Sequence, residues 1–369
     1  MRNPGKTLPL LAVIMLAVML IAGIISLMNS IPLSITTIYS YSRFSLGVSP
    51  RGDQSQLEEI TRRIDGGSPV PIERTLVCRV TNAMVDSMVG KWPFVVLGFE
   101  QQDMRYYVQK LGGGRLVGRY PDLGKPEAVV SRPVATNLGL SIGDPLIGPD
   151  KVDSYSPQNV LVVGIIESEE WIMFAPVEYL RENHFPPVDV LLVFAESQVD
   201  QQILDAWALE EFEGERARLY TFQDLEQQTE EAFQTLYTII NIVIGSLVVV
   251  ITIMMGMLIN IYQAQRIQEF GLLQALGYRK GTILKRLLAE TGLVLAGSWL
   301  FGLVVAYALL WFVKLQVFDP RAFAIDPTDP SAIFYSVPVP VMIFAVAALD
   351  LVIRLRRFDP VVVVERRLV

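Results

Sequence analysis

The sequence is poor in the residues that most often build catalytic and metal sites. Its 369 residues include one histidine, His184, and one cysteine, Cys78. A lone cysteine excludes an intrachain disulfide, and one histidine with one cysteine excludes the usual zinc ligand sets. A Ser-His-Asp arrangement would need His184, whose context "ENHFPP" is typical of a loop. We therefore predict no catalytic residues, no metal site and a buried structural role for Cys78.

The sequence also lacks a nucleotide-binding motif and an excess of positive charge. The glycine-rich stretch "GGGR" at 112–115 is not followed by the Lys-Ser/Thr pair and helix of a P-loop, so it indicates a turn. The formal net charge is −7, which argues against nucleic acid as a partner. The acidic residues are scattered, as on an ordinary solvated surface.

Apolar residues, by contrast, are abundant and gathered into long runs. The chain is 51% hydrophobic, and four runs carry most of this, at 8–28, 236–262, 287–313 and 333–353. At about 1.5 Å per residue, roughly 20 helical residues cross a hydrocarbon core of about 30 Å. The runs predict four transmembrane helices. The first could instead be a cleaved signal peptide behind Arg2 and Lys6, but its length and the following "MNSIPLSI", without a small-x-small site, favour a retained helix.

Positive charges between and after the runs set the orientation. Lys and Arg mark the cytoplasmic side, and they gather between the second and third runs and after the fourth, at Arg266, Arg279, Lys280, Lys285, Arg286, Arg354, Arg356, Arg357, Arg366 and Arg367. The acidic, proline-rich loop after the third run then lies outside, with the large region after the first run. This predicts a multi-pass membrane protein with its large domain outside the cytoplasm.

The large outer region has the pattern of a mixed α+β domain. Short β-branched and apolar stretches bounded by turn residues predict strands at 75–80, 94–100, 127–131, 159–167 and 188–196. Helices are predicted at 131–139, with Ser131 as N-cap and Gly139 as stop, and from Ser197. The predicted fold class is a membrane protein of four transmembrane α-helices with a large α+β extracytoplasmic domain inserted between helices 1 and 2.

The segment before the second run predicts an unusually long helix. From Phe222, apolar residues recur on one face, Thr221 can cap the start, and neither proline nor glycine occurs before Gly245. One helix over 222–262 would be roughly 60 Å long at 1.5 Å per residue, about twice the membrane core. Such a rod could carry displacement across the membrane. The alternative is a helix that breaks at the membrane interface.

These observations divide the chain into nine segments. We predict a cytoplasmic N-terminus (1–7), helix 1 (8–29), the outer domain (30–221), a stalk helix continuing into helix 2 (222–262), a cytoplasmic loop (263–286), helix 3 (287–313), an outer loop (314–332), helix 4 (333–353) and a cytoplasmic tail (354–369).

The cytoplasmic loop contains a short amphipathic helix. In "QEFGLLQALGYRKGTILKRL", Phe270, Leu273 and Leu276 share one helical face, and Gly277 supplies a C-terminal stop. A lipid-bound interfacial helix is one interpretation. The cations follow the helix, however, and the helix itself carries Glu269 and Gln274, which favours a protein groove.

The same stretch resembles the signature of FtsX/MacB-type ABC transporter permeases, approximately R-E-I-G-x-L-R-A-L-G-A-x-x-x-x-I. The matching residues are Glu269, Gly271, Leu273, Ala275, Leu276, Gly277 and Ile283, while Gln274 replaces a usual basic residue. The tail "RLRRFDPVVVVERR" resembles the closing segment of that family. "GGGRLVGRYPDLGKPEAVVSRPVATNLGLSIGDPL" is similar to part of the MacB-like periplasmic core domain.

The resemblance implies a permease that pairs with a second copy or a paralogue and sits on a separate ABC ATPase subunit. ATP and Mg would be bound by that ATPase, and this chain would be non-catalytic and hold no cofactor. Other implied partners are membrane lipid and an extracytoplasmic protein. The ATPase-coupling helix would comprise Glu269, Phe270, Gly271, Leu272, Leu273, Gln274, Ala275, Leu276 and Gly277, with Leu273 and Leu276 in an apolar groove of the ATPase.

Small and polar residues in the apolar runs predict helix packing. Ser298, Gly302 and Ala306 form a small-xxx-small-xxx-small stripe on which another helix can approach closely. Asn241 and Asn260 are candidates for hydrogen bonds between helices.

The sequence is compatible with several functions. The family resemblance fits export or extraction of a lipid-linked, amphiphilic or peptide substrate, resistance to peptide antibiotics, or FtsX-type control of a cell-wall hydrolase. The outer domain of about 200 residues favours the MacB-like group. A transmembrane sensor is an alternative from another class, and a membrane-anchored enzyme is disfavoured because no catalytic constellation is found.

Overall fold

The structure is a computed structural model that describes residues 4–186, 188–265, 273–274 and 276–357. The chain forms two compact units. The sheet unit comprises Ser30–Phe233 and Leu315–Ile325, and the membrane unit lies within Met1–Asn29, Gln234–Lys314 and Asp326–Val369. Two helices, α1 (Pro4–Ile38) and α7 (Phe222–Gln265), contribute residues to both units.

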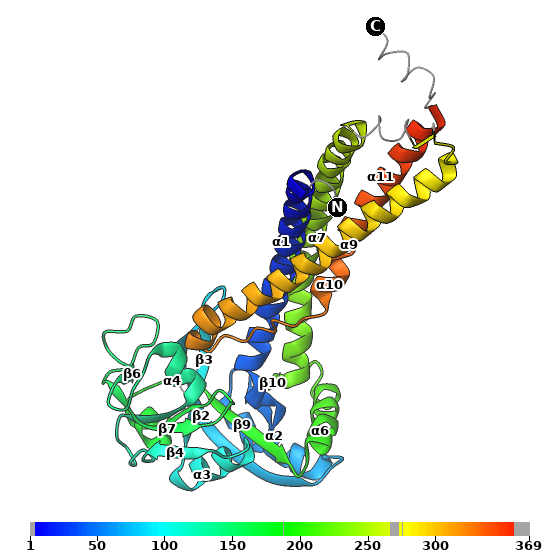
Figure 1. Ribbon diagram of the computed structural model, residues 1–369. Coiled ribbons are helices and arrows are strands. Elements are labelled where there is room, and N and C mark those ends of the chain that lie inside the picture. The colour runs from blue at the N-terminus through cyan, green and yellow to red at the C-terminus, as the bar shows by residue number, and fades with distance from the viewer. Residues whose placement is uncertain (1–3, 187, 266–272, 275, 358–369) are drawn as a thin grey trace. The chain divides into compact units, whose positions relative to one another are not determined.

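The sheet unit is built on one mixed sheet of ten strands (Figure 1). Their spatial order is β10-β1-β9-β2-β3-β8-β5-β7-β4, with β6 paired to β7. Two pairs, β3 with β8 and β5 with β7, are parallel. The strands are β1 (Leu46–Pro50), β2 (Ile72–Ser87), β3 (Gly90–Phe99), β4 (Arg115–Gly118), β5 (Glu127–Ser131), β6 (Pro145–Ile147), β7 (Val160–Glu167), β8 (Met173–Pro176), β9 (Asp189–Ala195) and β10 (Ala217–Tyr220).

The helices of the sheet unit are short and locally capped. They are η1 (Ser40–Arg43), η2 (Gln54–Gln56), α2 (Leu57–Gly67), α3 (Gln101–Lys110), α4 (Arg132–Leu138), α5 (Val177–Glu182) and α6 (Gln198–Glu211). Ser197 caps α6 because its side chain accepts from the Asp200 amide, and α4 ends on Gly139 in the left-handed conformation. Ser131 stands at the N-cap position of α4 without capping it, because its Oγ accepts from the Ile172 amide at 3.0 Å.

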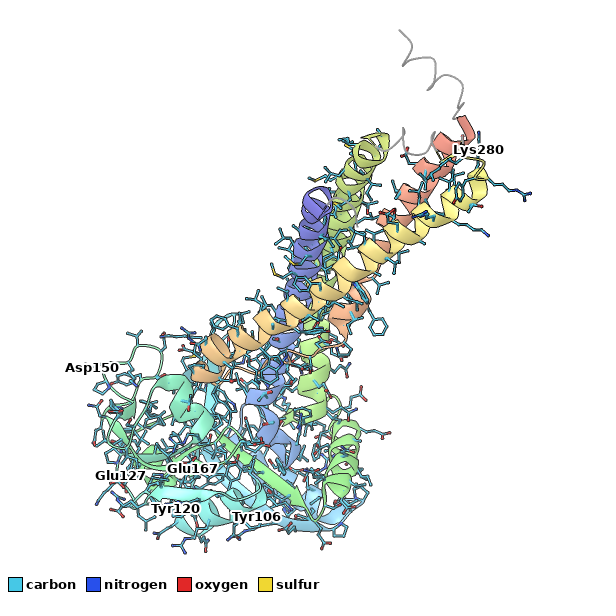
Figure 2. The ribbon with its side chains drawn as sticks, viewed as in Figure 1. Tyr106, Tyr120, Glu127, Asp150, Glu167 and Lys280 are labelled. Atoms are coloured by element: carbon cyan, nitrogen blue, oxygen red, sulfur yellow. The ribbon has the colours of Figure 1, made fainter. Side chains whose placement is uncertain are left out.

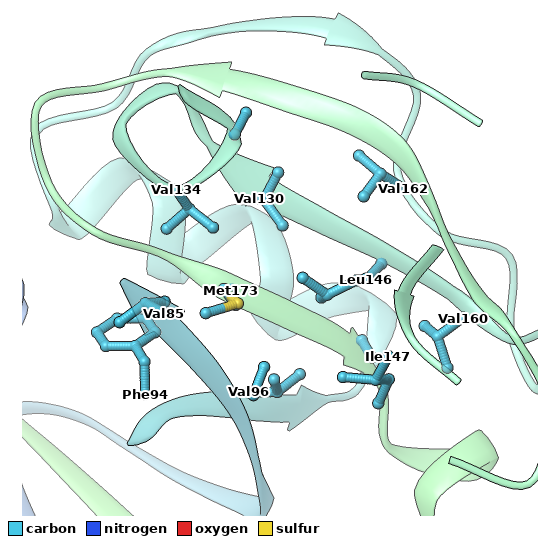
Figure 3. Close-up of a cluster of buried hydrophobic side chains, with 14 of the residues drawn as sticks. Val85, Phe94, Val96, Val130, Val134, Leu146, Ile147, Val160, Val162 and Met173 are labelled. Atoms are coloured by element: carbon cyan, nitrogen blue, oxygen red, sulfur yellow. The ribbon is translucent and has the colours of Figure 1, made fainter. Parts of the chain in front are cut away.

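Alternating apolar residues of the strands form the core of the sheet unit. Figure 3 shows one cluster, in which side chains from β2, β3, β5, β7 and β8 meet α4 and β6. Its labelled members are Val85, Phe94, Val96, Val130, Val134, Leu146, Ile147, Val160, Val162 and Met173. Full burial of a side chain of this kind is worth about 1.5–3 kcal/mol, so the cluster is a main source of stability for the domain.

The C-terminal end of α1 is fixed to the sheet by aromatic residues. Tyr39 follows the helix directly, and its hydroxyl donates to the Pro93 carbonyl at 2.6 Å while accepting from Trp92 Nε1 at 2.9 Å. Ser40 Oγ hydrogen-bonds to the Glu170 carboxylate. The helix is therefore held to the beginning of β3 by directional bonds as well as by packing.

A second attachment joins the outer loop to α4. The segment Leu315–Ile325 includes η4 (Asp319–Arg321), and the Arg321 carbonyl accepts a hydrogen bond from Asn137 Nδ2 at 2.8 Å. Ala322 packs against the same apolar cluster that Figure 3 shows. This loop is thus part of the sheet unit, which the sequence alone did not indicate.

Among the described residues, four helices are long and apolar enough to cross a membrane, as predicted. They are α1, α7, α9 (Lys280–Val313) and the pair α10 (Ser331–Ser336) and α11 (Pro338–Arg357). Apolar residues of all four meet in one cluster, with Ile21, Val248, Leu295 and Ile343 among its members. The predicted fold class, four such helices with a sheet domain inserted after the first, is confirmed.

Several helix boundaries differ from the prediction, and α9 begins at Lys280, seven residues before the predicted span. The first helix continues past residue 29 to Ile38, where the aromatic attachment begins. The fourth span is divided at Val337 because Pro338 and Pro340 cannot donate backbone hydrogen bonds to the preceding turn. The second span is one α-helix of 44 residues, Phe222–Gln265.

The small-residue stripe of α9 lies against α1. Ser298, Gly302 and Ala306 are all buried, and a Cβ added to Gly302 would lie 3.2 Å from Met15 Cα and 3.1 Å from Val18 Cβ. Contacts this short to a backbone atom leave no room for a side chain.

Substituting Gly302 should separate α1 from α9. We expect Gly302→Leu to lower the free energy of unfolding by about 1–3 kcal/mol or more, the range for overpacking a close contact. The matched control is Gly297→Leu on the same helix, where an added Cβ meets no described heavy atom within 4 Å. Thermal unfolding of the purified protein would check this, and equal melting temperatures for the two variants would contradict the close contact.

Cysteine labelling in intact cells should report the orientation. Cys78 is fully buried and burial raises the pKa of its thiol, so the native chain should give almost no background. With an impermeant maleimide, we expect Val152→Cys, whose parent residue is 93% exposed, to react and Leu276→Cys to stay unlabelled. Both should react in detergent, and labelling of Leu276→Cys from outside would reverse the assigned orientation.

Candidate functional site

The predicted ATPase-coupling segment connects α7 to α9. Gln265 is the last residue of α7, and Lys280 begins α9. Part of the predicted site, namely Glu269, Phe270, Gly271, Leu272 and Ala275, lies outside the described residues. The structure describes Leu273, Gln274, Leu276 and Gly277, so the geometry below concerns the end of the segment.

Gly277 ends the segment with a pair of reversed hydrogen bonds. Its amide donates to the Gln274 carbonyl at 2.9 Å, and the Tyr278 amide donates to the Leu273 carbonyl at 3.2 Å. This is the Schellman pattern, and it requires a left-handed residue, which Gly277 supplies with φ of 90°. The predicted glycine stop is thus present, and it turns the chain sharply before α9.

The two leucines of the predicted contact lie in different environments. Leu273 packs against a cluster formed by Ile283 and Leu287 of α9 and Leu351 of α11. Leu276, in contrast, has 68% of its surface exposed. Leu273 therefore contributes to holding the segment on its own chain, while Leu276 is available to a docking protein.

Gln274 faces inward rather than outward. Both atoms of its side-chain amide are buried, and neither forms a hydrogen bond with a described residue. This residue stands where the family signature usually has a basic residue. Its position makes it part of the support of the segment, so a docking protein would not meet it directly.

A polar contact holds together the helices that flank the segment. Asn260 Nδ2 of α7 donates to Asp350 Oδ1 of α11 at 3.3 Å. This confirms the predicted interhelical bond for Asn260, whereas Asn241 is exposed. Because Leu351 contacts Leu273, α11 is linked to α7 on one side and to the coupling segment on the other.

The sheet unit carries ion pairs on its surface. Arg119 binds Glu127 through two bonds of 2.7 and 2.6 Å, and Arg132 pairs with Glu167. The Arg119 guanidinium lowers the pKa of the Glu127 carboxyl. Figure 2 labels both glutamates on the sheet unit. Such pairs keep their carboxylates ionised and occupied, which is the reverse of what general acid catalysis needs.

The remaining candidate residues have structural environments. Cys78 is buried and its Sγ donates to the Val190 carbonyl at 3.4 Å, so the predicted structural role is confirmed. His184 lies in a turn with φ of 55°. Gly112, Gly113 and Gly114 have positive φ and form the predicted turn. Within the described residues, no group of three or more His, Cys, Asp or Glu side chains could hold a metal ion.

Comparisons with known proteins agree with this arrangement. Residues 225–360 match the family model described as FtsX-like permease C-terminal. A search of curated proteins finds no match.

Among solved structures, the periplasmic region of MacB from Actinobacillus actinomycetemcomitans is similar at 9% identity and a TM-score of 0.29, covering 50% of this chain and 92% of that one. The extracellular domain of the noncanonic ABC-type transporter YknZ from Gram-positive bacteria gives 14% identity and a TM-score of 0.24, covering 48% of this chain and 100% of that one. Both similarities are weak, and the assignment rests on the family model.

The match begins at the fourth residue of α7 and runs through the coupling segment and α9 to the end of α11. It therefore includes every predicted coupling and helix-packing residue. The resemblance predicted from the motif at 268–287 is confirmed for the C-terminal part of the chain, because residues 225–360 match the FtsX-like permease C-terminal family.

Proposed function

We propose that this chain is the membrane subunit of an ABC transporter complex that couples ATP hydrolysis on a separate ATPase to mechanical work on a substrate outside the cytoplasm. The substrate class is a lipid-linked, amphiphilic or peptide molecule that is extracted or exported. ATP and Mg belong to the ATPase, and two permease chains complete the complex. Support for this comes from the family match and from the described geometry of α7 and Leu276.

The single observation that carries the proposal is the continuity of α7. Its 44 residues extend about 66 Å at about 1.5 Å per residue, without a break between the sheet unit and the second apolar span. Backbone hydrogen bonds join consecutive turns of the helix, so a sharp kink in α7 would have to break some of them. Force applied at the coupling segment after Gln265 can thus reach Phe222.

The first turns of α7 are stabilised by contacts within the helix itself. Thr221 Oγ1 caps the start by accepting from the Asp224 amide at 3.1 Å. Along the exposed face, Gln227 donates to Glu231 at 3.0 Å and Gln228 donates to Asp224 at 2.6 Å, both across one helical turn. These local contacts stabilise the helix where packing is one-sided.

A transmembrane regulator of FtsX type, or a sensor, would need the same helix. Such a protein would bind an outer cell-wall hydrolase or ligand and pass a signal through α7. Copurification with an ATPase separates the transporter from a pure sensor. Genes adjacent to this one would give the cheapest indication of the substrate.

Truncation of Leu276 should weaken ATPase binding without affecting the fold. Burying a leucine in a groove is worth about 1.5–3 kcal/mol, so we expect Leu276→Ala to reduce affinity for the ATPase about tenfold or more. The matched variant is Leu273→Ala, which should instead lower the melting temperature because its side chain packs on Ile283, Leu287 and Leu351.

Copurification from membranes and thermal unfolding of the purified permease would measure both effects. The assignment of the docking surface fails if Leu276→Ala retains normal ATPase binding and normal coupled function.

A flexible joint in α7 should disconnect the ATPase from the sheet unit. Glu230 and Glu231 are exposed, so replacing both with glycine removes few contacts and costs about 1 kcal/mol per glycine in helix propensity. We expect Glu230→Gly with Glu231→Gly to bind the ATPase and hydrolyse ATP but to lose outer activity in cells.

Alanine at the same two positions is the matched control, because it removes the same charges and keeps the helix stiff. Full activity of the double-glycine variant at normal expression would show that α7 does not transmit the force. Loss of activity in the double-alanine variant would trace the effect to the carboxylates instead.

A further inference from the structure

A cavity lined by mostly polar or charged residues lies beside the first turns of α7, within the sheet unit. Its volume is about 530 Å³, inside the range of about 300–1,000 Å³ typical of small-molecule sites. Three chain segments line it, namely η1, α6 and the start of α7, through Arg43, Gln198, Gln202, Asp205, Phe222, Gln223 and Glu226.

Strand pairing brings these segments together. η1 leads into β1, α7 follows β10, and β1 pairs with β10 in antiparallel register, with Gly47 opposite Tyr220. The chain therefore enters and leaves the sheet at adjacent strands. Arg43 and Phe222 meet there, with the guanidinium carbon 4.2 Å from the ring centroid.

Asp205 is the buried member of the lining. Only 5% of its surface is exposed, and Oδ1 accepts a hydrogen bond from Gln201 Nε2 at 2.9 Å. Gln201 is itself fixed, because its Oε1 accepts from the Ala195 amide at 2.9 Å. Oδ2 of Asp205 forms no hydrogen bond with a described residue, and no described Lys or Arg lies within ion-pair distance.

A buried carboxylate without a cation is costly to ionise. Burial raises the pKa of Asp205 to about 6, so the group is mostly charged at neutral pH despite this cost. Buried charges in proteins are usually paired or bind a cation. The partner of this one is missing from the described chain, and the carboxylate lines a cavity open to solvent.

Arg43 supplies the opposite charge on the same cavity. Its guanidinium is stacked on Phe222, which fixes its direction, and no described carboxylate pairs with it. Asp205 and Arg43 therefore line one cavity without reaching each other. The side-chain amides of Gln198, Gln202 and Gln223 offer both donors and acceptors along the walls.

We propose that this cavity binds a free amino acid or a short peptide, with its ammonium group on Asp205 and its carboxylate on Arg43. The glutamine amides would hydrogen-bond to the peptide group between them. A neutral sugar would leave the Asp205 charge uncompensated, and a phosphate ligand would meet the carboxylates of Asp205 and Glu226. The proposal is independent of the proposed function.

The cavity escapes sequence analysis because its charged residues are far apart along the chain. Arg43 follows a predicted membrane helix, whereas Asp205 sits on a helix of ordinary composition. The one signal in the sequence is an acid on an apolar stripe, since Asp205 follows the buried Leu204 and precedes the buried Ala208 by one turn.

Calorimetric titration of the purified full-length chain in detergent tests the proposal. The probes are L-alanine and L-alanyl-L-alanine, with N-acetyl and C-terminal amide forms of the dipeptide as analogues lacking one charge. We expect saturable binding of at least one zwitterionic probe and at least tenfold weaker binding of both analogues. No saturable binding of either probe at millimolar concentration, or equal binding of the acetylated form, would overturn it.

Two substitutions locate the site. Asp205→Asn keeps the acceptor for Gln201 and should weaken probe binding at least tenfold, as should Arg43→Gln. Glu210→Gln is the matched control, an exposed acid on the same helix α6 outside the cavity lining, and should bind normally.

A melting temperature for Asp205→Asn at or above that of the parent shows that the loss is not unfolding. If that variant does not fold, Arg43→Gln and the two analogues decide the question alone. Unchanged affinity in Arg43→Gln, or in a folded Asp205→Asn, overturns the assignment.

Discussion

Backbone hydrogen bonds inside a hydrocarbon layer must be satisfied within the helix, and α7 continues as a helix beyond its apolar span. Each unpaired amide or carbonyl in lipid costs several kcal/mol, so the helix cannot end among residues such as Ile242 and Ile253, which are exposed on its surface. It begins instead at Phe222, in the sheet unit, where Thr221 Oγ1 accepts a hydrogen bond from the Asp224 amide. One helix consequently serves both units.

The rest of the sheet unit is arranged around the two helices that enter it. α1 ends at the aromatic attachment formed by Tyr39 and Trp92, and α7 begins at the end of β10. Arg43, which follows α1, stacks on Phe222 next to the paired strands β1 and β10, whereas Tyr39 and Trp92 meet at β3, in the middle of the strand order. The two helices therefore attach to different parts of the sheet, α7 at its β10 margin and α1 also at the central strand β3.

Much of the fold could be predicted from local sequence patterns. The elements that could not be predicted depend on pairing between distant parts of the chain. The four apolar spans, the strands near 75–80, 94–100, 127–131, 159–167 and 188–196, and the caps at Ser197 and Thr221 follow from local pattern. Strands such as β6 and β10 hold only three or four residues, too few for a period to show, and exist because a neighbour supplies their hydrogen bonds. At the coupling segment, the motif predicted Gly277 and Leu276 but not the inward packing of Leu273, which depends on Leu351 far along the chain.

The proposed cavity and the coupling segment adjoin the first and last turns of one helix. Gln223 and Glu226 line the cavity, and Gln265 precedes the segment that carries Leu276. If ATPase docking changes the position of α7 and thereby the affinity of the cavity for its ligand, linkage requires the ligand to change ATPase affinity by the same factor. A helix stiff enough to transmit force from the ATPase to the sheet unit can also transmit the effect of a ligand in the cavity back to the ATPase. The proposed transporter and the sensor alternative then become two uses of one mechanical element, and which dominates depends on how strongly the ligand distinguishes the two positions of α7.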